Sequence, residues 1–140
     1  MHTTMNDTIE KTRWFAHPID KVWNAITQTE QVSQWLVPTD FKAVAGSNYV
    51  LRSTKDDCNV VTGKVVEATP YKLVYTWINE KSKDVVTTVS WNLVEENEGT
   101  TLTMIHSGIS GYDANTAPEM IEDYTNGWNR CFNNLGEILS

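Results

Sequence analysis

The pattern of apolar residues near the N-terminus changes from that of a strand to that of a helix just before Pro18. Thr8 to Phe15 is rich in strand-forming residues, whereas Pro18 has the fixed φ angle that suits a first helical turn. Val22, Trp23 and Ile26 then recur at helical spacing. The pattern predicts one strand, a short amphipathic helix and a second short helix after it.

After Trp35 the pattern becomes one of short strands. Turn signals at residues 46–48, 55–57 and 69–70 break the range from Phe41 to Glu80 into short apolar runs. Runs of this length between tight turns favour antiparallel pairing.

The clearest strand signal lies at residues 85–94, where odd positions are mostly apolar and even positions mostly polar. A charged loop at 95–99 then returns the chain through a second strand at 100–106. In that strand Met104 and His106 point to one side. The alternation predicts a sheet with one buried face and one face in water.

A long helix is predicted at the C-terminal end. Residues 107–115 contain two glycines and should form a loop, and Thr116 is the expected N-cap, with Pro118 in the first turn. The helix should run nearly to Ser140, and its apolar stripe needs a sheet to cover it. The stripe comprises Met120, Ile121, Tyr124, Trp128, Cys131, Phe132, Leu135, Ile138 and Leu139.

The run from Phe15 to Thr27 reads FAHPIDKVWNAIT, and it resembles the opening of the START-like, helix-grip superfamily (SRPBCC). Later motifs look like its branch similar to the activator of heat-shock chaperone ATPase (AHSA-like). These are Trp35 and residues 63–67, 70–77, 99–104, 106–108 and 127–128.

The resemblance extends over nearly all 140 residues and implies a single START-like domain at residues 1–140. The implied fold class is α+β: a curved antiparallel sheet of about six to seven strands wrapped around a long C-terminal helix, as in birch-pollen allergens. Two short helices follow the first strand. In this superfamily a cavity lies between the sheet and the helix.

Composition and charge narrow the range of partners. The formal net charge is −7, and no cluster of Lys and Arg is present, which argues against nucleic acid or an anionic membrane as a partner. No apolar run approaches the roughly 20 residues that span a bilayer, and residues 1–7 lack a signal peptide's apolar region. We expect a cytoplasmic protein that is a monomer or a weak homodimer.

The sequence gives no sign of a metal or another cofactor. Cys58 and Cys131 are isolated, so we expect two reduced thiols. Glu119, Glu122 and Asp123 gather near the start of the last helix and are compatible with a cation site. Carboxylates in a first turn interact favourably with the helix dipole without any ligand, however, and we expect no bound ion.

Aromatic residues are the strongest chemical signal, with six tryptophans and five tyrosines. Trp77, Trp91 and Trp128 should face the interior between sheet and helix. Core filling explains Trp23 and Trp91 best, whereas for the other two it competes evenly with ligand contact. The candidate ligand-binding residues are Trp35, Phe41, Trp77, Met104, His106, Tyr124 and Trp128.

The leading hypothesis is that the protein binds a small hydrophobic or aromatic molecule in the implied cavity, without a cofactor. No catalytic motif is present, and no residue is assigned a catalytic role.

Two alternatives stay open. The helix-grip relatives include polyketide cyclases and dehydratases, so an enzyme could use His106 to handle protons, helped by Tyr124 or Tyr75. The AHSA-like proteins are named for stimulating a chaperone ATPase, which implies a heat-shock chaperone as a third kind of partner. This chain resembles only their C-terminal domain and has no room for their N-terminal one, so we expect chaperone stimulation less.

Overall fold

The computed structural model describes residues 8–36, 39–52, 60–80, 84–113 and 115–139. In this part of the chain, an antiparallel sheet of six strands packs against a long C-terminal helix. The elements in chain order are β1 (Ile9–Phe15), α1 (Ile19–Thr27), α2 (Thr29–Trp35), β2 (Asn48–Arg52), β3 (Val60–Thr69), β4 (Lys72–Asn79), β5 (Thr87–Glu96), β6 (Gly99–Ser107), the 3-10 helix η2 (Ile109–Gly111) and α3 (Ala117–Ile138). The α+β class, the two short helices and the long terminal helix confirm the sequence prediction.

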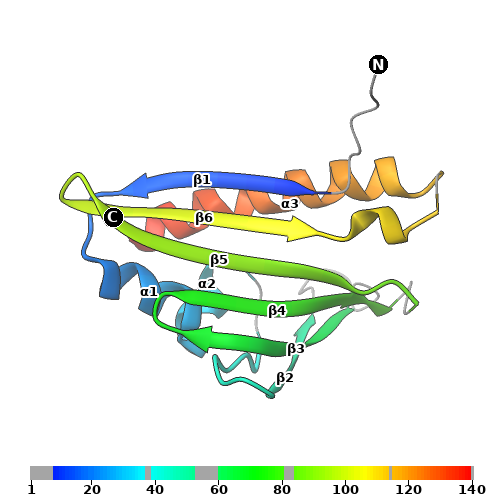
Figure 1. The fold of residues 1–140 in the computed structure, drawn as a ribbon, viewed down its shortest axis with the longest axis horizontal. Coiled ribbons are helices and arrows are strands. Elements are labelled where there is room, and N and C mark those ends of the chain that lie inside the picture. The colour runs from blue at the N-terminus through cyan, green and yellow to red at the C-terminus, as the bar shows by residue number, and fades with distance from the viewer. Residues whose placement is uncertain (1–7, 37–38, 53–59, 81–83, 114, 140) are drawn as a thin grey trace.

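The strand order in the sheet is β1-β6-β5-β4-β3-β2. β1 therefore pairs with β6, and Ile9 lies opposite His106. A register shift between Val65 and Glu67 marks an irregularity in the β3–β4 pair, of the kind that bends a sheet. Figure 1 shows α3 behind β1 and β6, with α1 and α2 at one end of the sheet.

The alternation of the strands places one face of the sheet against the helices. In β5 the odd residues from Thr87 to Leu93 are buried, and in β6 Leu102, Met104 and His106 are fully buried. In β4 the buried residues are Leu73, Tyr75 and Trp77. The predicted alternation is confirmed in β5 and β6, and Trp77 of β4 faces the interior as predicted.

α3 begins after Thr116, as predicted, but the Thr116 side chain makes no capping hydrogen bond. Thr116 already has helical backbone angles, with φ −89° and ψ −35°, whereas a capping residue usually has extended ones. The Asp113 carboxylate accepts hydrogen bonds from the backbone N–H groups of Asn115 (2.9 Å) and Thr116 (2.8 Å). These bonds hold the pKa of Asp113 below its usual value.

Trp91 fills the core as predicted, whereas Trp23 packs against the core without being fully enclosed by it. Trp91 is fully buried, whereas Trp23 is half-buried at the edge of the core and meets Tyr71 edge-on, with ring centroids 5.8 Å apart. The predicted turn at 55–57 and Cys58 lie outside the described residues. Within the described ranges, no helix combines the length and the apolar character needed to cross a membrane.

Candidate functional site

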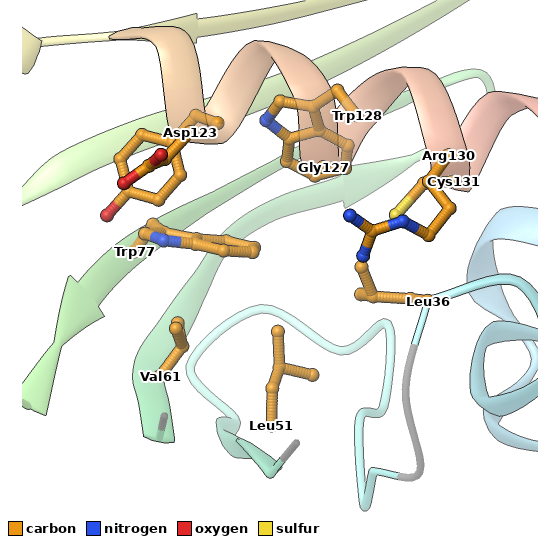
Figure 2. A pocket seen from close by; sticks show the side chains of 10 residues that line it. Leu36, Leu51, Val61, Trp77, Asp123, Gly127, Trp128, Arg130 and Cys131 are labelled. Carbon is orange, nitrogen blue, oxygen red and sulfur yellow. The ribbon is translucent and has the colours of Figure 1, made fainter. Parts of the chain in front are cut away.

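A cavity of about 290 Å³ lies between α3 and the part of the sheet formed by β2, β3 and β4. Figure 2 shows Trp77 across from α3, with Val61 and Leu51 on its far side and Leu36 at one end. The lining residues are Leu36, Leu51, Val61, Trp77, Asp123, Tyr124, Gly127, Trp128, Arg130 and Cys131. Most of this surface is apolar, and the charged groups come from α3.

Gly127 keeps the helix side of the cavity open. A Cβ atom built at this position would meet nothing within 4 Å. Glycine in the middle of a helix costs roughly 0.5–1 kcal/mol relative to alanine, so helix stability does not account for its presence here. Its effect on the structure is to leave space opposite Trp77.

Three aromatic rings form one wall of the cavity. The ring centroids of Trp77 and Trp128 are 5.4 Å apart, and those of Trp77 and Tyr124 are 6.1 Å apart in an edge-on arrangement. The Tyr124 hydroxyl lies 3.0 Å from that of Tyr112. These contacts fix the rings, so the wall is preformed.

Trp128 is held from behind by a buried chain of hydrogen bonds. Its indole N–H donates to Nδ1 of His106 at 3.0 Å, and Nε2 of His106 lies 2.8 Å from Oγ1 of Thr87. The Thr87 hydroxyl donates in turn to the carbonyl of Trp77 at 3.0 Å. Because Nδ1 accepts, the neutral His106 ring carries its proton on Nε2 and donates it to Thr87.

His106 is fully buried, and burial lowers its pKa to about 3. Both ring nitrogens already have protein partners, and the residue does not line the cavity. This environment favours a neutral structural histidine over one that exchanges protons with a bound molecule.

A second aromatic cluster fills the core beside the cavity. The rings of Phe41, Tyr49 and Tyr75 meet edge-on, with centroids 5.3–5.4 Å apart. The Tyr75 hydroxyl accepts a hydrogen bond from the Trp91 indole at 3.0 Å, and burial raises its pKa above the usual value. Trp35 packs edge-on against Trp91 and donates to the Ala25 carbonyl at 2.7 Å.

The structure thus divides the seven candidate residues into two groups. Trp77, Tyr124 and Trp128 lie together around the cavity, whereas Trp35, Phe41, Met104 and His106 are buried outside its lining. Sequence reasoning missed the lining residues Leu36, Leu51, Val61, Asp123, Gly127, Arg130 and Cys131.

A helical projection from Trp128 contains the signal for part of the missed set. Cys131 and Tyr124 lie three and four positions from Trp128, and Gly127 lies three and four positions from Tyr124 and Cys131, so these spacings place the residues on adjoining parts of the helix surface. Leu36, Leu51 and Val61 come from three separate elements, and no local spacing links them.

The polar groups around the cavity do not form a metal site. Among the described residues, no group of three or more His, Cys, Asp or Glu side chains could hold an ion. Cys131 is partly buried against the cavity, and burial raises the pKa of its thiol to about 12. This thiol is therefore neutral at physiological pH.

Residues 16–140 match the family model described as Activator of Hsp90 ATPase homolog 1-like protein. The chain belongs to this family. Family and fold place it in the START-like SRPBCC superfamily and support a domain of the ligand-binding type. No curated protein matches the chain.

Solved structures agree with this assignment. Protein MLL2253 from Mesorhizobium loti is 26% identical over 94% of this chain and 96% of its own, with a TM-score of 0.84. Protein BH1534 from Bacillus halodurans is 29% identical over 95% of this chain and 96% of its own, with a TM-score of 0.75. CalU16 from Micromonospora echinospora shares the fold, with 23% identity over 95% of this chain and 76% of its own and a TM-score of 0.77.

Proposed function

We propose that the protein binds a small hydrophobic or aromatic molecule in the cavity between α3 and strands β2 to β4. The observation that carries this proposal is the preformed aromatic wall, formed by Trp77 of β4 with Tyr124 and Trp128 of α3, next to a helix position, Gly127, that leaves the space open. Ligand pockets typically measure roughly 300–1,000 Å³, so a cavity of about 290 Å³ suits one small molecule.

Trp77 adds a polar feature to this wall. Its side chain is 8% exposed, and its indole N–H has no hydrogen-bond partner among the described residues. A buried donor without a partner costs roughly 1–3 kcal/mol. A ligand with an acceptor oxygen that reaches this N–H after a small shift of the ring would recover part of that cost.

The experiment uses N-phenylnaphthylamine (NPN), an uncharged aromatic probe that fluoresces in apolar surroundings. Gly127→Leu should fill the cavity and weaken NPN binding by at least about tenfold, because a buried leucine displaces the probe. Asn126→Leu places the same side chain on the neighbouring exposed position and should leave binding unchanged. Unfolding curves of both variants establish that each is folded.

Two outcomes contradict the proposal. One is the absence of saturable NPN binding to the wild-type protein. The other is equal binding to the wild type and to Gly127→Leu, which would place the probe elsewhere.

Acid–base catalysis has less support from the geometry. His106 and Tyr75, two of the three groups considered for proton transfer, are buried, engaged in hydrogen bonds and absent from the cavity lining. Tyr124 lines the cavity, but its hydroxyl is already paired with that of Tyr112. A binding protein requires none of these groups to change protonation state.

The family assignment supports a second candidate function, interaction with a heat-shock chaperone. The test is an ATPase assay of the cognate chaperone with and without this protein. Gly127→Leu separates the two functions: stimulation that persists in this variant after NPN binding is lost would not depend on the cavity.

A further inference from the structure

Arg130 is the one Lys or Arg residue among the described side chains that line the cavity. It is exposed on α3, and in the described part of the chain no carboxylate pairs with it. Figure 2 shows its guanidinium turned from the helix toward Leu36, at one end of the cavity. An available cation therefore stands beside an apolar binding surface.

Asp123 lies at the opposite end of the same row of side chains in Figure 2. Seven residues of α-helix separate it from Arg130, a rise of roughly 10 Å. At physiological ionic strength the Debye length is about 8 Å, so the carboxylate only weakly offsets the charge of Arg130. The cavity has a positive end and a negative end.

The charge of the whole protein makes the position of Arg130 informative. With a formal net charge of −7, the protein repels anions in general. An uncharged apolar ligand would need no cation at the cavity, whereas an anionic one needs a local charge to overcome this repulsion.

We infer that the ligand is an apolar or aromatic acid, with its body between Trp77 and α3 and its single acidic group bound by Arg130. This inference rests on the proposed function and specifies the ligand class. A guanidinium suits the acid because its planar donors can bind two oxygens of a carboxylate at once. Asp123 disfavours a second acidic group at the other end of the ligand.

The test compares two probes that share an aromatic body and differ by one charge: anilinonaphthalene sulfonate (ANS) and uncharged NPN. The wild-type protein should bind ANS more tightly than NPN, by roughly three- to tenfold, as expected for one partly exposed charged contact. Arg130→Gln should remove this preference, because it should weaken ANS binding several-fold more than NPN binding. Added salt should reduce the preference in the wild type, because the contact is exposed.

Lys64→Gln is the matched control, because it removes the same charge elsewhere. Lys64 is exposed on β3 next to buried Val65, so its side chain points away from the cavity. Its substitution should change ANS affinity much less than Arg130→Gln does. Gly127→Leu should abolish binding of both probes and so locate ANS in the cavity.

The outcomes separate this inference from the proposed function. If NPN binds in the cavity but ANS binds no more tightly, or if Arg130→Gln and Lys64→Gln weaken ANS equally, the acid inference is wrong and the proposed function stands. ANS binding that survives Gly127→Leu also overturns the inference. If neither probe binds saturably, both fall.

Discussion

The indole N–H of Trp128 donates a hydrogen bond to Nδ1 of His106 across 3.0 Å, inside the core. Both side chains are at most 2% exposed, so no water competes for the bond. It links α3 to β6 and sets the orientation of a ring that lines the cavity. The histidine therefore acts on the site through Trp128.

Trp128→Phe should destabilise the protein by about 1–3 kcal/mol beyond the effect of ring size, because Nδ1 of His106 is left as a buried acceptor without a donor. Urea unfolding followed by circular dichroism measures this change. Trp14→Phe is the control: Trp14 is 44% exposed, and its N–H donates to the Glu96 carbonyl at 3.0 Å near the surface. If both variants lose the same free energy of unfolding, the buried hydrogen bond contributes no more to stability than the exposed one.

The stability of the protein should fall in acid partly because of His106. Its pKa is about 3 in the folded protein, whereas an unperturbed histidine has a pKa of 6.5, so between these values the unfolded chain binds more protons. The stability conferred by the neutral ring is complete above the unfolded pKa and is lost as the pH falls toward the folded one. The slope approaches about 1.4 kcal/mol per pH unit for one proton.

His106→Gln tests this assignment, because glutamine can donate and accept but does not titrate in this range. Urea unfolding of both proteins across this pH window should show the wild-type advantage shrinking as the pH falls. An advantage that is constant with pH would show that another group accounts for the acid sensitivity.

Two glycines should respond in opposite ways to alanine. In Gly63→Ala the new Cβ would overlap the Thr76 carbonyl and the Tyr49 ring, so we expect a loss of about 1–3 kcal/mol or more. Gly127→Ala meets open space and should stabilise the helix by about 0.5–1 kcal/mol. Thermal unfolding of the pair decides the matter, and a destabilised Gly127→Ala would mean that the space at this position is not free.

The elements with a regular period could be predicted from the sequence. The stripe of α3 and the alternation in β5 each depend on local spacing, and both appear in the structure with the predicted faces. The position of Thr116 before α3 could be predicted from residue type, but its missing capping bond could not, because Asp113 also has a suitable side chain and its carboxylate accepts from the nearby N–H groups.

The cavity could be predicted only in part, for a physical reason. An inward-facing aromatic residue can fill the core or border a space, and the difference depends on what packs against it. Trp35 meets Trp91 and is enclosed, whereas Trp77 faces the bare position at Gly127. The opposite wall consists of Leu36, Leu51 and Val61, and it forms only when elements far apart in the sequence pack together.

The alkylation rate of the Cys131 thiol can be used to measure whether the cavity is occupied. Burial raises the pKa of its thiol to about 12, so the thiolate that reacts with alkylating agents is scarce at neutral pH. In a Cys58→Ser background, iodoacetamide should therefore modify the folded protein much more slowly than the urea-unfolded one. Saturating NPN should slow the reaction further, since the thiol lines the cavity. Equal rates with and without NPN would place the probe away from Cys131.

The pairing of β1 with β6 affects how the protein can be made. The ribosome releases β1 first, yet its neighbour in the sheet is the last strand to be synthesised, and α3 follows even later. Contacts between residues so far apart form slowly, and the inward apolar residues stay exposed until then. Stalled nascent chains that end before Ala117 should remain sensitive to protease, whereas released full-length chains should resist it. Emergence of α3 from the ribosome, rather than synthesis of any earlier segment, is then the event that allows the core to close.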